Sequence, residues 1–290
     1  MTQTFVLEIT NGCNWGKCPH CYMSALEKNY SFLPIEKAEQ IIKKLTNTQD
    51  KPSHILVTGG EPLIHQGLVE ILQIIKAHGF NTTLVTNGEL INKKFAQQAS
   101  EFIDNLEVTF RGYRNLHDIM MQPADSELWD KVDNLEEAIE LHKDDSHYQK
   151  TLKGLTTMAE YSKGIKLGLN IDAQINTDME EIVQDLTNHG IRVDYINIQI
   201  QQISGRAKKF FEVPANKWRQ LDAPAIEEYL KQAENLIQKK IIKNIGIIDP
   251  IKQEIKDILP EKLLEKYYSL EVSPAVNCFG NLRKNVLFTN

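Results

Sequence analysis

Three of the four cysteines of this chain lie within nine residues, in the stretch TNGCNWGKCPHCYM at positions 10–23. Cys13, Cys18 and Cys21 form the pattern C-x4-C-x2-C, and closely spaced thiolates bind soft metal centres. A mononuclear zinc site normally uses four protein ligands in two separated pairs, so Cys278 or a histidine would have to complete it. A four-iron four-sulfur (4Fe–4S) cluster is the alternative, because three thiolates leave one iron open to a substrate or cofactor. The spacing alone does not distinguish among a zinc site, a 4Fe–4S cluster and buried thiols that bind no metal.

The cellular compartment bears on this choice. The N-terminus MTQTFVLEIT has a strand pattern without the basic segment and cleavage site of a signal peptide. No apolar run approaches the roughly 20 residues that span a bilayer. We therefore expect a cytoplasmic protein with no membrane association, whose thiols are kept reduced. In that compartment, clustered cysteines indicate metal or redox chemistry rather than a disulfide framework.

A second motif, VTGGEPLI at positions 57–64, follows a predicted strand. Gly59 and Gly60 allow a close approach of the backbone to a ligand, and Glu61 adds an anionic acceptor beside them. Pro62 suits the start of a helix. Considered alone, the motif is equally typical of a tight turn between a strand and a helix.

The elements that must position these motifs follow from the periodicity of apolar residues. We expect strands at 5–10, 54–60, 81–88, 105–112, 164–175 and 192–200. We expect helices at 34–47, 63–79, 91–101, 149–162, 178–189 and 225–243, with a polar excursion over 113–148 that is partly helical. Strands alternating with helices predict an α/β fold with a parallel sheet and right-handed crossovers.

Six such units predict a partial (β/α)6 TIM-like barrel with a small C-terminal extension, and the site at the C-terminal ends of the strands. A doubly wound open sheet is the structural alternative. We divide the chain into a core at 1–205 and C-terminal helices with a cap element at 206–290. The net charge of −6 argues against a general nucleic-acid binder. The basic run GRAKKFF at 205–211 fits either one anionic ligand, held through Arg206, or a solvated edge.

The pairing of a three-cysteine loop after the first strand with GGEP after the second resembles the radical S-adenosylmethionine (radical SAM) superfamily over residues 4–205. The resemblance implies two cofactors, a 4Fe–4S cluster and SAM, which binds the fourth iron through its amino and carboxylate groups. It also implies reductive cleavage of SAM to methionine and a 5′-deoxyadenosyl radical, which abstracts hydrogen from a substrate. A flavodoxin or a ferredoxin-type protein would supply the electron.

The resemblance assigns roles residue by residue. Cys13, Cys18 and Cys21 become the cluster ligands, and Gly59, Gly60, Glu61 and Pro62 become the motif that meets the methionine amino group of SAM. His20, just before the last cysteine, would lie near the adenine. The remaining SAM contacts would come from strand ends: Thr109 and Arg111 on the fourth strand, Asn170 and Asp172 on the fifth, and Gln199 or Gln201 on the sixth. Each of these is equally interpretable as a packing residue inside the barrel.

The first cysteine gap departs from the commonest spacing of the family, C-x3-C-x2-C. Asn14, Trp15, Gly16 and Lys17 make it one residue longer. Gly16 is expected to absorb the additional length in a turn, because glycine has the freest backbone. The departure limits what can be inferred about the substrate from any one subfamily.

Cys278, in VNCFGNLRKNVLF, stands far from the loop, and three interpretations compete. It is an inert buried thiol, a hydrogen-atom donor to a substrate radical as in radical SAM peptide epimerases, or the start of a cysteine-rich SPASM-like extension. The chain provides no further cysteines for an auxiliary cluster, so we expect one cluster.

The single cluster and the SPASM-like tail favour a peptide or an amino-acid side chain as substrate, modified or epimerised. A nucleotide or another small molecule is the alternative. Substrate contacts are expected just beyond the fourth strand, at Tyr113, Arg114, His117 and Asp118, unless this is a solvated loop. A hypothesis from a different class is a non-catalytic iron–sulfur or zinc-binding scaffold or electron carrier.

Overall fold

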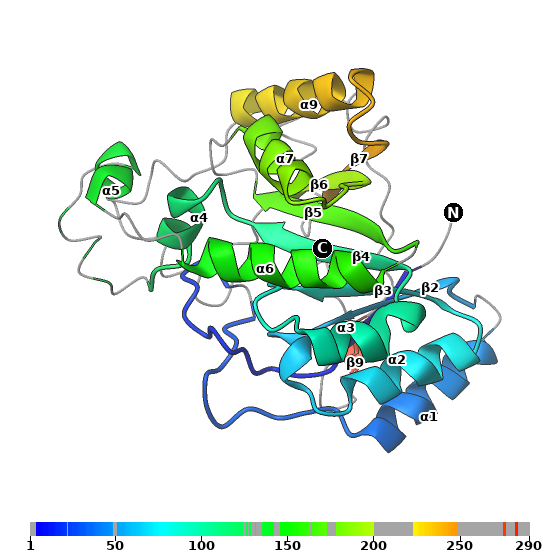
Figure 1. Cartoon of the computed structure of the whole chain (residues 1–290). Coiled ribbons are helices and arrows are strands. Elements are labelled where there is room, and N and C mark those ends of the chain that lie inside the picture. Colours follow the sequence, from blue (N-terminus) through cyan, green and yellow to red (C-terminus); the bar gives the residue numbers. More distant parts are fainter. Residues whose placement is uncertain are drawn as a thin grey trace.

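The computed structural model describes residues 4–21, 23–48, 51–123, 126, 128, 131, 135–141, 146–162, 164–172, 178–199, 223–248, 275–276 and 282–283. In this part of the chain, strands and helices alternate and build a curved parallel sheet with helices on its outer side (Figure 1). The arrangement is the α/β architecture expected from the periodicity of the sequence.

The sheet is built from seven parallel strands in the order in which the chain makes them. These are β1 (Thr4–Glu8), β2 (His54–Thr58), β3 (Asn81–Thr86), β4 (Asn105–Phe110), β5 (Lys166–Asp172), β6 (Tyr195–Gln199) and β7 (Asn244–Ile248). A doubly wound sheet reverses its strand order at a switch point, whereas β1 to β7 of the described chain follow one another without a reversal. The sequential order therefore supports the partial barrel and argues against the doubly wound alternative.

The C-terminal part of the chain adds to both edges of this sheet. The segment NIGII forms β7, which pairs with β6 in parallel over five residues. Two short strands, β8 (Ala275–Val276) and β9 (Leu282–Arg283), lie at the other edge, where Val276 pairs with Leu7 of β1. The division of the chain at residue 205 stays a prediction.

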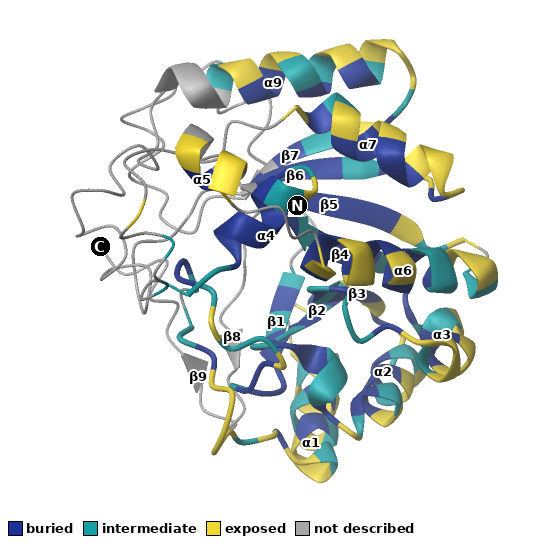
Figure 2. Cartoon of the chain, turned by 60° about the vertical axis from the view of Figure 1, so that its left-hand side comes forward, coloured by how far each residue is buried: buried dark blue, intermediate teal, exposed yellow. Residues whose placement is uncertain are grey.

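Most helices follow the strands and bury one face against the sheet, whereas α5 lies beyond α4 and away from the sheet (Figure 2). They are α1 (Ile35–Thr46), α2 (Leu68–Ala77), α3 (Lys93–Ala99), α4 (Asn115–Met120), α5 (Leu135–Leu141), α6 (Ser146–Tyr161), α7 (Met179–Asn188) and α9 (Ala223–Gln238), with 3-10 turns η1 (Pro62–Ile64) and η2 (Ser100–Phe102). The start of α7 is fixed by Asp178, whose carboxylate accepts the N–H groups of Glu180 and Glu181. No helix in the described part of the chain is long and apolar enough to cross a membrane.

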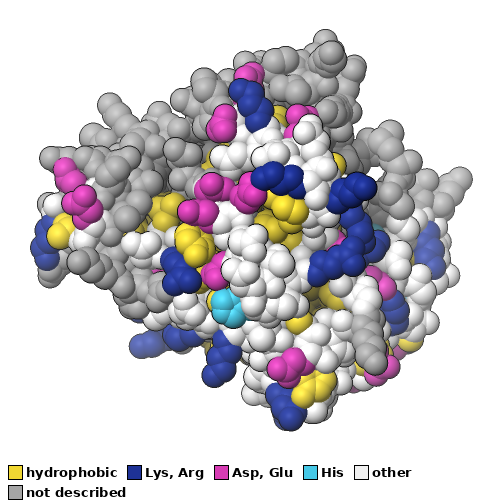
Figure 3. Space-filling view, turned by 45° about the horizontal axis from the view of Figure 1, so that its top comes forward, with side chains coloured by type: hydrophobic (Ala, Val, Ile, Leu, Met, Phe, Trp, Pro, Cys, Tyr) yellow, Lys and Arg dark blue, Asp and Glu magenta, His cyan; other side chains and the backbone are white. Residues whose placement is uncertain are grey.

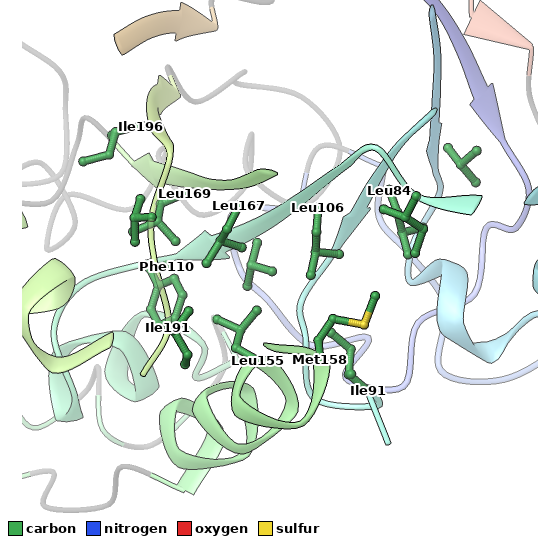
Figure 4. Packing of buried hydrophobic residues seen from close by; sticks show 14 of the residues in the cluster. Leu84, Ile91, Leu106, Phe110, Leu155, Met158, Leu167, Leu169, Ile191 and Ile196 are labelled. Carbon is green, nitrogen blue, oxygen red and sulfur yellow. The ribbon is translucent and has the colours of Figure 1, made fainter. Parts of the chain in front are cut away.

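The hydrophobic core lies between the outer face of the sheet and the helices. Figure 4 shows its centre, where Leu106 and Phe110 of β4 face Leu155 and Met158 of α6. Phe110 is completely buried. Because such a ring cannot be replaced without leaving a cavity, Phe110→Ala would cost about 3–5 kcal/mol of unfolding free energy.

The inner face of the sheet is polar, since side chains alternate between the two faces of a strand. Leu106, Val108 and Phe110 point to the helices, so Glu107 and Thr109 point inward. The outer surface of the molecule is mixed: Figure 3 shows basic and acidic side chains interspersed on one face. The polar inner face and the C-terminal strand ends are therefore where a ligand site is to be sought.

Candidate active site

The loop between β1 and α1 carries the three cysteines and is folded back on itself. Cys13 donates its N–H to the carbonyl of Leu26 (2.9 Å), and Leu26 donates its own to the carbonyl of Asn11 (2.9 Å). None of the three thiols forms a disulfide; that of Cys13 is buried, and those of Cys18 and Cys21 are partly exposed. Three thiols thus lie on one hydrogen-bonded loop beyond the C-terminal end of β1.

Gly16 turns this loop as expected. Its φ of +61° lies in the left-handed region that glycine adopts without strain. A Cβ atom at this position would also lie 2.1 Å from Cγ of Glu27. The longer gap between the first two cysteines therefore depends on a residue without a side chain.

Two other residues of the longer gap are anchored to different parts of the barrel. The amide of Asn14 donates to Glu89 Oε2 (2.6 Å), in the loop after β3. The indole N–H of Trp15 donates to the carbonyl of Met121 (2.9 Å), at the end of α4. Neither contact was predicted, because both partners are more than seventy residues away in the sequence.

The GGEP motif contacts the cysteine loop through its backbone. Gly60 donates its N–H to the carbonyl of Thr10 (2.9 Å), and Glu61 donates its own to the carbonyl of Gly12 (2.8 Å). A Cβ atom on Gly60 would lie 2.1 Å from the oxygen of Gly12. In this structure, the glycines permit the close approach of the two motifs to each other.

The carboxylate of Glu61 points into the protein. It is completely buried and accepts hydrogen bonds from the N–H of Leu63 (3.0 Å), the hydroxyl of Thr86 (2.7 Å) and the N–H of Asn87 (2.8 Å). Burial raises the pKa of Glu61 to about 7, while these hydrogen bonds act against that rise. We expected Glu61 to offer an acceptor to a ligand beside the glycines. In the structure, its carboxylate instead accepts hydrogen bonds from the loop after β3. The signal for that partner was VTNG at 85–88, at the end of a strand.

Two further predicted residues lie beside these motifs. His20 is buried, with 3% of its surface exposed. Pro62 is also buried and begins the 3-10 turn η1, as its position after Glu61 suggested.

The candidates on β4, β5 and β6 lie in neighbouring rows. Thr109 pairs in register with Asn170, and Asn170 pairs with Asn197. Gln199 pairs with Asp172, and this pair lies two residues closer to the C-terminal ends of the two strands. Thr109 and Asn170 are thus next to each other, as a shared site requires.

Asn170 belongs to a buried network that the sequence did not reveal. Glu107 accepts hydrogen bonds from Asn170 Nδ2 (3.2 Å), the hydroxyl of Tyr195 (3.0 Å) and Asn197 Nδ2 (3.3 Å). The carbonyl oxygen of Asn170 accepts from Asn197 (3.0 Å). Burial raises the pKa of Glu107, and the three donors act in the opposite direction.

Arg111 follows β4 and is half-buried, and its N–H donates to Nδ1 of His117 on α4 (2.9 Å).

Cys278, Gln201 and Arg206 lie outside the described residues, as do the side chains of Asp172 and Gln199. Among the described residues, no three His, Cys, Asp or Glu side chains are grouped closely enough to surround a single metal ion.

The comparisons with known proteins bear on this geometry. The model of the radical SAM superfamily matches residues 7–147, which include the cysteine loop, GGEP and the loop after β3. The chain carries a radical SAM domain. The expected superfamily is thus confirmed for this part of the chain, and a 4Fe–4S cluster with SAM is the cofactor pair that this superfamily uses.

Relatives of the radical SAM domain differ in what their names say they do. A 7-carboxy-7-deazaguanine synthase of Halobacterium salinarum is 32% identical over 83 residues, 28% of this chain and 30% of the relative. A GTP 3′,8-cyclase of Helicobacter pylori is 24% identical over 197 residues, 64% of this chain and 60% of the relative. The crystal structure of Streptococcus suis SuiB bound to its precursor peptide SuiA superposes with a TM-score of 0.65 at 15% identity, covering 99% of this chain and 60% of SuiB. The chain thus spans less than two thirds of each of these proteins, and the likeness to SuiB concerns the fold.

Proposed function

We propose that this chain is a radical SAM enzyme that reductively cleaves SAM at a 4Fe–4S cluster and abstracts hydrogen from a peptide or an amino-acid side chain. The observation that carries the proposal is the pair of backbone hydrogen bonds that joins Gly60 to Thr10 and Glu61 to Gly12. They hold the three-cysteine loop and GGEP as one unit at the C-terminal end of the sheet.

The donor set fits such a cluster. Cys13, Cys18 and Cys21 lie on one loop and form no disulfide, and they would hold three irons, leaving the fourth for the amino and carboxylate groups of SAM. The backbone of GGEP would receive the amino group, because the Glu61 side chain is engaged elsewhere. His20 would lie near the adenine in this assignment.

The polar inner face would receive the rest of SAM. Thr109 and Arg111 would contact its ribose or carboxylate, and Asn170 and Gln199 are the further candidates. Thr109 and Asn170 are neighbours in register, which supports a shared role. Asn170 also hydrogen-bonds to Glu107 and Asn197, which places its amide in a polar network on this face.

A 4Fe–4S cluster held by Cys13, Cys18 and Cys21 would, when reduced, supply the one electron needed for reductive cleavage of SAM and so the radical chemistry by which hydrogen would be abstracted from the substrate. The protein must supply the electron donor's docking site and exclude water from the radical. A flavodoxin or a ferredoxin-type protein is the proposed donor. The helix α4, directly beyond β4, is available as a wall of the substrate pocket.

Two of the comparisons bear on the class of substrate. SuiB, whose fold this chain shares, is a structure with a bound precursor peptide, and this favours a peptide. The similarity to a GTP 3′,8-cyclase over 64% of the chain favours the alternative, a nucleotide. Cys278 remains a proposed hydrogen-atom donor for the peptide case.

Anaerobic reconstitution with iron and sulfide, followed by dithionite and SAM, tests the proposal. We expect about four irons per chain and formation of 5′-deoxyadenosine. Cys18→Ala should abolish that product, whereas Cys278→Ala should retain the iron because it changes a cysteine outside the loop. Bound zinc with no 5′-deoxyadenosine would contradict the enzyme and favour the scaffold hypothesis.

Isotope incorporation distinguishes the substrate classes. Candidate peptides and nucleotides are incubated separately with the reconstituted enzyme in deuterated water. A peptide that gains one deuterium only with intact Cys278 would support epimerisation. Consumption of a nucleotide with no change in any peptide would favour the alternative.

A further inference from the structure

Trp15, in the longer cysteine gap, rests against a wall made by α4 and α6. Its N–H donates to the carbonyl of Met121, and its ring meets that of His147 edge to face, with 4.8 Å between centroids. The sulfur of Cys18 lies 3.6 Å from the sulfur of Met121. The same wall therefore contacts both the gap and one proposed cluster ligand.

A pair of buried histidines forms this wall. His117 and His147 are 1% and 0% exposed, and His117 Nε2 lies 2.8 Å from His147 Nδ1. The N–H of Arg111 can only donate, so Nδ1 of His117 is the acceptor and its Nε2 carries the proton. His147 Nδ1 then accepts, and its Nε2 carries the second proton. The backbone of Arg111 thus fixes the tautomers of both rings.

The ring of His147 lies close to Glu89, the residue that accepts the hydrogen bond from Asn14 of the cysteine loop. His147 Nε2 is 3.9 Å from Glu89 Oε2 and forms no hydrogen bond within the described part of the chain. Glu89 itself accepts from Asn14 (2.6 Å) and Lys150 (2.7 Å). Both residues of the gap therefore lead to His147, Asn14 through Glu89 and Trp15 through its ring.

The backbone of His147 is also restrained, by a hydrogen bond to Asp118. Asp118 of α4 accepts the N–H groups of His147 (2.7 Å) and Tyr148 (3.1 Å), which joins α4 to the first turn of α6. Burial lowers the pKa of both histidines, that of His147 to about 4, so both are neutral at pH 7. Two neutral imidazoles in a dry interior cost more to bury than apolar rings of the same size. What they add is a fixed ring orientation.

We propose that His117 and His147 are positioning residues for the cysteine loop: their hydrogen bond orients the ring on which Trp15 rests and thereby sets the position of Cys18. The inference rests on the proposed function for the role of that loop. Its mechanical part, the restraint of Cys18 by the histidine pair, can be measured without the cluster.

The first test uses the iron-free full chain under reducing conditions and follows alkylation of each cysteine by iodoacetamide with mass spectrometry. His147→Phe keeps a ring beside Trp15 and removes the acceptor, and His147→Asn keeps an acceptor near the position of Nδ1 and removes the ring. In both, Cys18 should react several-fold faster relative to Cys21, which serves as internal reference. His54→Phe, the same change at a histidine that contacts Thr83 on the inner face, should leave the ratio unchanged.

Circular dichroism must show that each variant is folded. Should both His147 variants fail to fold, Trp15→Phe replaces them, because it removes the N–H to Met121 and shortens the ring that meets His147, and it should raise the same ratio. An unchanged ratio of Cys18 to Cys21 in the folded variants would overturn the inference.

The second test uses the reconstituted protein. His147→Phe should retain its iron but form 5′-deoxyadenosine about tenfold more slowly, with an altered electron paramagnetic resonance spectrum of the reduced cluster in the presence of SAM. A variant with wild-type rate and spectrum would overturn the role in the loaded enzyme. Absence of a cluster in the wild type would instead overturn the proposed function, and the alkylation test would still judge the histidine pair.

Discussion

Two buried glutamates, Glu61 and Glu107, accept hydrogen bonds in two different regions of the molecule. The donors to Glu61 are mostly backbone groups, whereas those to Glu107 are side chains. Glu61 serves the loops at the C-terminal ends of β2 and β3, where two of its three donors are backbone N–H groups, those of Leu63 and Asn87. Glu107 serves the inner face of β4, β5 and β6, where Asn170, Tyr195 and Asn197 donate from their side chains. In both cases burial raises the pKa of the carboxyl group.

The difference lies in what the partners can do when the carboxylate changes. A backbone N–H cannot turn away without moving its loop, so Glu61 determines where the loops lie. Side chains such as those of Asn170 and Asn197 can rotate or exchange partners, so Glu107 belongs to a network that can adjust. We infer that the cysteine and GGEP side of the site is rigid, whereas the β4–β6 side can accommodate different ligands.

The largest expected effect is that of Glu61→Ala. It leaves three buried donors without an acceptor, and at about 1–3 kcal/mol for each such group it should lower the free energy of unfolding by about 4 kcal/mol. The reconstituted variant should also lose iron. Urea unfolding of the iron-free chain and an iron assay measure the two effects.

Glu107→Ala is the matched control for that prediction. It also removes three hydrogen bonds from a buried carboxylate, but its donors can rotate, so its loss should be about half as large. A loss at Glu107 equal to or larger than that at Glu61 would contradict the proposed difference between the two regions.

The pH dependence of stability should reveal the burial of Glu61. Its pKa in the folded protein is about 7, against the ordinary value of 4.5, so the folded state holds this proton more tightly than the unfolded state. The resulting stability is complete below pH 4.5 and is lost as the pH rises toward 7, by at most about 3 kcal/mol. Unfolding of wild type and Glu61→Gln is compared from pH 4.5 to 8. A constant difference between them over this range would show that the carboxyl group titrates normally.

Glu107→Gln should be tolerated better. Glutamine keeps the shape and one acceptor oxygen, and the neighbouring amides of Asn170 and Asn197 can reorient to meet its new donor. The expected cost is about 1 kcal/mol of unfolding free energy, the value of one hydrogen bond. Denaturant midpoints of the two proteins measure it, and a cost above about 3 kcal/mol would indicate that the network is as rigid as the loops.

The smallest effect is expected at the solvent edge of the rigid side. Lys150 pairs with Glu89 at 2.7 Å, but its side chain is 53% exposed. Lys150→Met should therefore change the free energy of unfolding by less than about 0.5 kcal/mol in moderate salt. A larger loss would mean that Glu89 needs this lysine to hold Asn14, which cysteine alkylation rates would also report.

The sequence predicted the sheet and the two motifs because both signals are local. Each strand and helix is a short period of apolar residues, and C-x4-C-x2-C and GGEP are contiguous. Thr109 and Asn170 were expected to lie close together because they stand near the ends of neighbouring strands, and parallel strands align their C-terminal residues. The place of NIGII beside β6, as a seventh strand of the same sheet, was not foreseen.

The remaining interactions could not be predicted, because their partners are brought together only by the fold. In NLEVTF at 105–110, polar residues alternate with apolar ones, and this pattern is the same for a strand that faces water. Nothing in the sequence therefore distinguished Glu107 from an exposed glutamate. His117 and His147 lie thirty residues apart, at the two ends of a stretch without periodicity.

The close contact of Gly60 with Gly12 has a consequence for natural and laboratory variation. The two positions are separated by nearly fifty residues of sequence, yet a methyl group added at Gly60 would overlap the backbone of Gly12. A substitution there could be accepted only with a compensating displacement of the whole cysteine loop. Because the overlap is with the backbone of Gly12, no change of side chain at position 12 would relieve it. Among related sequences, we therefore expect Gly60 not to vary, and a library that randomises Gly60 alone should yield almost no active members.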